Sequence, residues 1–128
     1  MLASCMAMAT SCGNTSKVDT SLINGEWLIE NAMGVTTETA ENEAFISFDG
    51  KGGVNGNASV NTFFGSYVYD GTSFKLDNIG MTRMFGASMD VEDAITEAIN
   101  TAASIEIDGD RATVRNEAGE AIMSLARK

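Results

Sequence analysis

The chain has 128 residues and a formal net charge of −10, from 18 acidic and eight basic residues. This charge argues against binding to nucleic acid or to anionic lipid headgroups, because like charges repel. Apolar residues make up 44% and charged residues 20% of the chain, which predicts one folded domain with its own hydrophobic core.

Residues 1–23 are predicted to be the remnant of a lipoprotein signal and a polar tether. Residues 2–5 (Leu-Ala-Ser-Cys) and 9–12 (Ala-Thr-Ser-Cys) both resemble the lipobox of bacterial lipoproteins, in which the cysteine carries the lipid. Four residues precede Cys5, whereas a signal peptide has an apolar region of about 7–15 residues. We therefore predict acylation at Cys12, with Cys5 the less favoured site. A disulfide between them and an inert apolar tail are the alternatives.

Residues 24–128 are predicted to form the domain, which begins with strands. Trp27 is expected to anchor the core from the first strand, and residues 44–48 form the second, ended by the turn signal Asp49-Gly50. After a glycine-rich strand, residues 64–69 alternate between two faces. One face carries Phe64, Ser66 and Val68, and the other carries Gly65, Tyr67 and Tyr69.

One helix is predicted before three short closing strands. The apolar positions with helical spacing are Val91, Ala94, Ile95, Ala98, Ile99 and Ala102. Asp90 is expected to be the N-cap, and Glu92 and Asp93 lie where the helix dipole favours negative charge. The pattern predicts a β-rich α+β fold with mostly antiparallel strands and one helix covering an open end of the sheet.

Glycine and aromatic residues at characteristic spacings run through residues 24–127. The main positions are Trp27, Gly56, Asn61, Phe63, Gly65, Tyr67, Thr82 and Met84. This set resembles the META domain family, which includes the HslJ-type heat-shock lipoproteins. The resemblance implies a barrel-like antiparallel sheet with a helix packed across it. It implies no particular chemistry, because the family has none that is agreed.

Two positions depart from the family pattern. Many members carry cysteines at the positions where this chain has Val60 and Gly86. Both cysteines are missing together, as expected if they form one disulfide in those members. The loss argues against a thiol-based role here and leaves the fold unaffected.

Several motifs that carry chemistry elsewhere have structural explanations here. The run from Gly50 to Gly56 is followed by a strand, not by the helix of a phosphate-binding loop. Met81, Met84 and Met89 could bind copper(I), but methionines more often fill gaps between a helix and a sheet. The sequence has no histidine, the commonest general base and metal ligand. We expect no catalytic residue, no metal and no cofactor.

The expected function is that of a non-enzymatic lipoprotein of a Gram-negative cell envelope, held at the outer membrane by its lipid anchor alone. As the family resemblance implies, it would bind another envelope protein, in connection with envelope stress. The glycine-rich hairpin, residues 50–57, is the expected contact surface, and the protein is expected to be a monomer. The alternative is a carrier of a small apolar ligand inside a barrel-like cavity. That cavity would be lined by Phe64, Tyr67, Val68 and Ile95.

Overall fold

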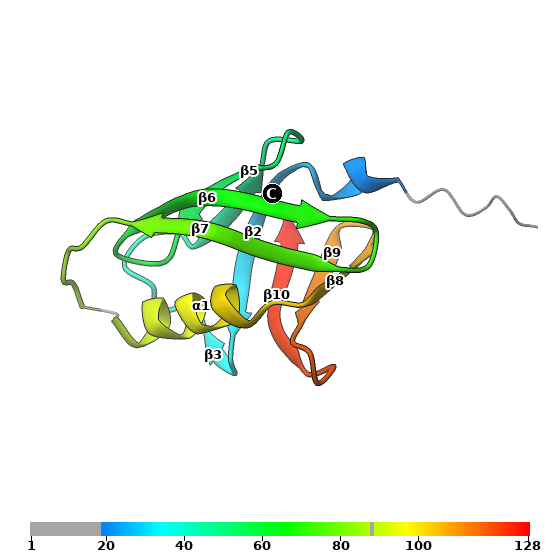
Figure 1. Ribbon diagram of the computed structural model, residues 1–128. Helices are drawn as coiled ribbons and strands as arrows, with labels where there is room; N and C mark the ends of the chain where they lie inside the picture. The colour runs from blue at the N-terminus through cyan, green and yellow to red at the C-terminus, as the bar shows by residue number, and fades with distance from the viewer. Residues whose placement is uncertain (1–18, 88) are drawn as a thin grey trace, which may run out of the picture.

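The computed structural model describes residues 19–87 and 89–128. In chain order the elements are η1 (Thr20–Ile23), β2 (Gly25–Ala32), β3 (Val35–Thr36), β4 (Phe45–Phe48), β5 (Gly53–Asn57), β6 (Thr62–Tyr69), β7 (Phe74–Met81), α1 (Met89–Thr101), β8 (Ser104–Asp108), β9 (Arg111–Arg115) and β10 (Ala121–Arg127). The predicted fold class is confirmed: among the described residues the strands form one curled antiparallel sheet with one α-helix, α1, packed on it (Figure 1). Cys5 and Cys12 lie outside the described residues.

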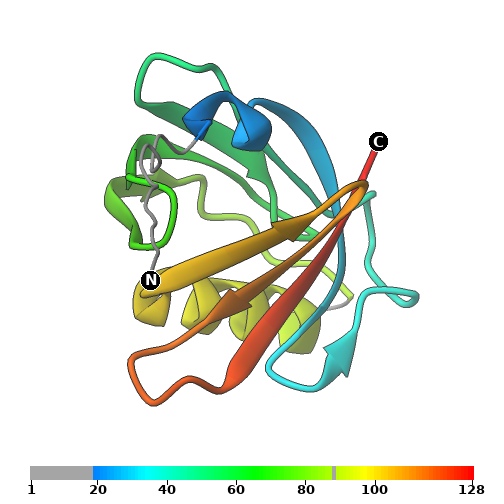
Figure 2. The same cartoon turned by 90° about the vertical axis from the view of Figure 1, so that its right-hand side faces the viewer.

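The sheet has the order β7-β6-β5-β4-β2-β10-β9-β8, with β3 beside β2. Its two outermost strands come together at one end, where Ser73 pairs with Ser104 and the Phe74 N–H donates to the Ala103 carbonyl over 3.0 Å. Away from this end the sheet stays open, and α1 lies across the opening (Figure 2). The sheet is therefore a half-barrel that a helix completes.

The first strand anchors the core, as predicted, and the residue before Asn24 packs with it. Trp27 is fully buried, and its indole N–H donates to the carbonyl of Ile23 over 2.9 Å. The Ile23 side chain is itself fully buried in the core. Arg127 covers the Trp27 ring at 3.9 Å and donates to the Asn24 carbonyl over 2.6 Å. Ile23 thus packs with the core next to the first strand.

The helix α1 buries the predicted apolar stripe, with Val91, Ile95 and Ile99 at most 2% exposed. It begins at Met89, so Asp90 lies inside the first turn and is not the N-cap that the sequence predicted. The helix packs on β2, β3 and β10. Among the described residues no helix is long and apolar enough to cross a membrane.

The glycine-rich segment is built into the middle of the sheet. A side chain at Gly56 would overlap the Phe45 carbonyl oxygen and lie 2.6 Å from the Phe63 ring, so only glycine lets β4, β5 and β6 approach this closely. The turn before β5 is held by Asp49, whose Oδ1 accepts from the backbone N–H groups of Lys51 and Gly53. These bonds lower the pKa of the Asp49 carboxyl. The hairpin that the sequence predicted at this turn is confirmed.

Candidate functional site

The side chain of Asn61 joins the start of β6 to the loop before α1. Its Oδ1 accepts from the Met84 N–H over 2.7 Å and from the Thr82 hydroxyl over 2.8 Å. Its Nδ2 donates to the Met84 carbonyl over 2.9 Å. Since Met84 offers both a donor and an acceptor, its peptide groups fix which way the amide points. The side chain is 98% buried, with an exposed fraction of 2%.

Asn61 also bonds to the carboxylate of Glu92 in the first turn of α1. One oxygen of Glu92 accepts from the backbone N–H groups of Asn61 over 2.7 Å and Val60 over 3.1 Å. The other accepts from Asn61 Nδ2 over 2.6 Å. Glu92 is 4% exposed, and none of the ion pairs among the described residues involves it. Three donors and the N-terminal end of the helix dipole therefore compensate the buried carboxylate.

We call Asn61, Glu92, Thr82 and Met84 the Asn–Glu latch. It brings together three of the family positions, Asn61, Thr82 and Met84. The other five lie in the sheet or the core: Trp27, Gly56, Phe63, Gly65 and Tyr67. The polar side chains of Asn61, Thr82 and Glu92 all have protein partners, so the arrangement suits holding two elements together.

Glu92 was not singled out as a buried group by the sequence. The acidic start of the helix offered a sufficient explanation for it, since carboxylates are favoured there. A signal was nevertheless present. Glu92 lies three and seven residues before Ile95 and Ile99, on the same face of the helix. An acid placed on the apolar stripe must be buried with partners or break the packing.

The loop between β7 and α1 is fixed at two points. Met84 is held by the latch, and the Ala87 N–H donates to the Glu41 carboxylate over 2.9 Å. A Cβ built at Gly86 would lie 2.7 Å from a methyl group of Val60. The two positions where many family members carry cysteine are therefore neighbours in this structure. Phe85, between the fixed points, is 92% exposed.

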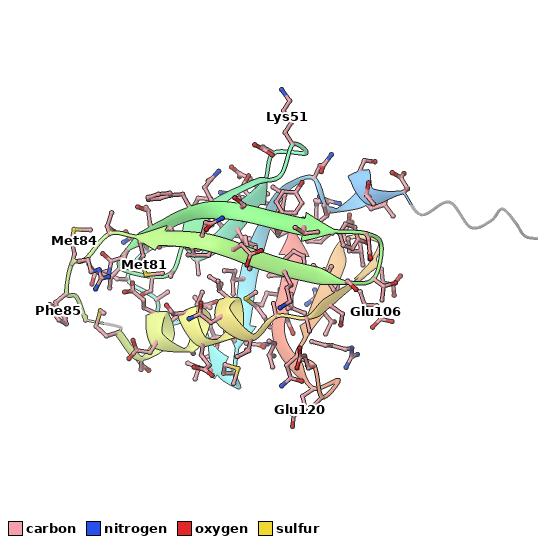
Figure 3. All side chains as sticks on the ribbon, in the orientation of Figure 1. Lys51, Met81, Met84, Phe85, Glu106 and Glu120 are labelled. Carbon is pink, nitrogen blue, oxygen red and sulfur yellow. The ribbon has the colours of Figure 1, made fainter. Side chains whose placement is uncertain are left out.

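A groove of about 780 Å³ lies beside this loop, between the end of β7 and α1. We call it the Phe85 groove. Its apolar lining comes from Phe64, Ile79, Met81, Met84, Phe85 and Met89, and Arg83, Glu92 and Asp93 supply its charged groups. Figure 3 shows Met81, Met84 and Phe85 together at one end of the molecule, far from Lys51 at the tip of the β4–β5 hairpin.

The four residues proposed for an internal ligand cavity do not come together. Phe64 and Val68 are 58% and 62% exposed, because they share the outer face of β6 as their alternation predicts. Tyr67 points to the inner face, where its ring packs edge-on against Phe48 at 4.9 Å. Ile95 lies on α1 and is fully buried in the hydrophobic core of the domain. A cavity lined by all four would need both faces of one strand.

The methionines expected near the helix, Met81, Met84 and Met89, all line the Phe85 groove. The Thr96 hydroxyl donates to the Met81 sulfur over 4.0 Å. Among the described residues, no three cysteine, aspartate or glutamate side chains are placed to hold a metal ion.

The curled sheet, the helix across its opening and the groove at that end define a small β-rich α+β module. The chain belongs to the META domain family, because a model of that family matches residues 20–128. The resemblance recognised in the sequence is therefore confirmed. No curated protein matches the chain.

Solved structures share the fold at low sequence identity. A protein solved by NMR is 19% identical with a TM-score of 0.66, over 83% of this chain and 91% of that one. An NMR structure from Burkholderia xenovorans is 15% identical with a TM-score of 0.65, over 94% and 95%. A DUF4847 family protein from Bacteroides vulgatus ATCC 8482 is 14% identical with a TM-score of 0.62, over 84% and 94%. These likenesses establish the fold alone.

Removing the latch carboxylate is expected to destabilise the domain. Glu92→Ala leaves three buried donors without an acceptor and should lower the free energy of unfolding by at least about 3 kcal/mol. Glu92→Gln keeps an acceptor for the two backbone N–H groups but turns an amide toward Asn61 Nδ2, so its loss should be smaller. The control is Asp93→Ala, an exposed acid on the same helix, which should change stability by less than about 0.5 kcal/mol. Urea titration followed by Trp27 fluorescence gives the unfolding midpoint of all three variants. Equal midpoints for Glu92→Ala and Asp93→Ala would contradict a stabilising role of the Glu92 carboxylate.

Cysteines at the two departing positions are expected to form a disulfide. With Cys5 and Cys12 replaced by serine, Val60→Cys with Gly86→Cys should lose both free thiols on mild oxidation, because the two side chains meet. The Glu41 carboxylate must swing aside, which a long exposed side chain can do. The closed loop should raise the free energy of unfolding by about 3 kcal/mol over the reduced form. Thiol counting and urea titration with and without reductant test this. Retention of both thiols would show that the positions are farther apart than the structure has them.

Proposed function

We propose that this protein is a non-enzymatic binding module of the cell envelope that recognises a partner protein through the Phe85 groove. The observation that carries the proposal is the set of exposed apolar side chains at one end of the molecule. Phe64, Met84 and Phe85 are 58%, 57% and 92% exposed. Large apolar groups gathered at one place on an acidic surface are typical of a protein contact site.

The support beneath these side chains favours binding. Met84 is held by the amide of Asn61, and Ala87 is held by Glu41, one residue on each side of the Phe85–Gly86 pair. A loop that is already ordered loses little conformational entropy when a partner binds. The exposed Phe85 side chain is thus carried by an ordered loop. Aromatic residues are common among those that contribute most to binding.

The charge around the groove favours a basic or neutral partner. The exposed acids of α1 are Asp90, Asp93 and Glu97, and this helix contains no basic residue. The whole chain carries −10. Such a surface attracts cationic segments and repels anionic ones at long range.

The hairpin expected from the sequence is a less suitable contact surface. Within residues 50–57, Gly50, Lys51 and Asn55 are the exposed positions. Both edges of β5 are taken by β4 and β6. What this hairpin offers a partner is chiefly its polar turn.

The proposal also includes a cellular location and a lipid anchor. We propose that Cys12 is acylated, that the protein is a monomer and that the lipid holds it at the outer membrane, where it takes part in envelope stress. Support comes from the lipobox-like residues 9–12 and from the resemblance to heat-shock lipoproteins. Neither the chemistry of the groove nor the fold depends on this cellular location.

The anchor is tested by labelling. The full chain is expressed in its own host with a clickable fatty acid, as wild type, Cys12→Ser and Cys5→Ser. Wild type and Cys5→Ser should incorporate the label and sediment with membranes, whereas Cys12→Ser should do neither. Labelling of Cys12→Ser at the wild-type level would refute acylation at this position.

The contact site is tested by photo-cross-linking in intact cells. A benzophenone amino acid placed at position 85 should give one discrete protein adduct. Probes at Lys51 and Glu120, on the hairpin and on the far loop in Figure 3, should give none. Phe85→Ser should lower recovery of the same partner at least about tenfold, a size typical of an aromatic hot spot. Since the side chain is 92% exposed, folding should be unchanged. Equal adducts from all three positions would contradict the groove as the contact site.

A further inference from the structure

The strand β7 has an open edge where it borders the Phe85 groove. One side of β7 pairs with β6. Among the described residues, backbone contact of its other side with β8 is confined to the start of the strand, at Thr72 to Phe74. Among the described residues, no backbone group outside the β6–β7 ladder bonds to the peptide groups of residues 75–81. The end of β7 therefore has backbone donors and acceptors that another strand could use.

The positions that face the open side follow from the ladder. The Thr82 N–H donates to the Thr62 carbonyl over 3.1 Å, so the peptide groups of Thr82 point toward β6. Since direction alternates along an antiparallel strand, the peptide groups of Met81 and Ile79 point away from β6. These two residues also line the groove. The free backbone groups and the side chains of Ile79 and Met81 are thus both available in the Phe85 groove.

The first part of the β7 edge is protected against strand addition. Asn78 has a φ of 55°, and the register with β6 shifts between Phe64 and Ser66, which together mark a bulge. Lys75 precedes it, and bulges and lysines are the usual devices that blunt an edge strand. Beyond the bulge, Ile79 to Met81 carries neither device. The open segment is the one beside the groove.

From this arrangement we propose that the Phe85 groove binds an extended peptide segment of the partner protein as an added strand on Ile79–Met81. The proposal rests on the proposed function and specifies how that same groove works. The groove runs beside α1 from Met89 to Asn100, which is about 17 Å at 1.5 Å per residue. An extended segment of about five residues fits this length. Its backbone bonds to β7, as in other cases of strand addition.

The chemistry of the groove defines the segment. One side chain in two points into the apolar lining made by Ile79, Met81 and Met89. Lysine or arginine is favoured at the position beside Asp93, which is exposed in the lining. Arg83 lies in the lining too, on the loop before the helix. The partner segment is therefore apolar and extended, with a basic residue toward α1.

The test uses four probe peptides and the full chain with Cys5→Ser and Cys12→Ser. The basic probe is acetyl-Lys-Val-Leu-Val-Lys-amide, and the acidic control replaces both lysines by glutamate. The other two probes are the basic peptide with N-methyl groups on alternate residues, one in each phase. N-methylation removes the ladder donors while keeping charge and side chains. Fluorescence anisotropy gives affinities, and amide exchange at Ile79 and Met81 reports the ladder.

The basic probe should bind with a Kd below about 1 mM, the range of weak contacts. The acidic control should bind at least tenfold more weakly, and so should the N-methylated form in one of its two phases. Binding should slow amide exchange at Ile79 and Met81. Asp93→Lys should reverse the preference between the basic and acidic probes, with Asp108→Lys, an exposed acid at the end of β8, as the matched control.

Four outcomes would overturn the inference. Equal binding of the parent and both N-methylated peptides would show groove binding without strand addition. No saturable binding of the basic probe, with the cross-link at position 85 still formed, would refute this peptide mode and leave the proposed function standing. Failure of both the peptide and the cross-link would remove the proposed function as well. Concentration-dependent protection of Ile79 and Met81 without peptide would identify a second copy of the chain as the occupant.

Discussion

The buried carboxylate of Glu92 is the constraint on which the open end of this domain depends. Burying a charge requires donors, and the nearest ones belong to the start of β6, at Val60 and Asn61. Meeting that requirement places the first turn of α1 against the sheet. The amide that donates to Glu92 also holds Met84, so the helix and the loop before it are positioned by one group of side chains.

This arrangement explains how a sheet that does not close can still be stable. Pairing of β7 with β8 is confined to one end, and α1 covers the rest by packing on β2, β3 and β10. The apolar stripe of the helix supplies the burial that further strand pairing would have supplied. Because the helix packs on the far strands, the edge of β7 near it stays open. The groove is a consequence of completing a half-barrel with a helix.

The sequence predicts those parts of the fold that follow from period and turn chemistry. The strands around Trp27, the hairpin at Asp49 and the stripe of α1 are all of this kind. Ile23 falls in the predicted tether because residues 13–21 are mostly polar, and no local pattern reveals that its side chain is buried in the core. The cavity residues failed for a related reason: Phe64 and Val68 were known to share a face, but which face is buried depends on the curl of the sheet. Asn61 is identified in the sequence only as a position of the family pattern. The burial of Glu92 is not predicted, because the helix dipole alone explains an acid at the start of the helix.

The departure at Val60 and Gly86 changes how the binding loop is held. In members that carry cysteines at these neighbouring positions, a disulfide would tie the loop to the start of β6. Here hydrogen bonds between Asn61 and Met84 connect the loop to the start of β6, and the bond from Ala87 to Glu41 holds it to the segment before β4. Hydrogen bonds in this number can order a loop, yet each exchanges with water far more easily than a covalent bond breaks. A glycine at position 86 also leaves room for the loop to pass close to Val60. The exposed Phe85 is therefore presented to a partner by a loop that polar contacts, without a disulfide, keep ordered.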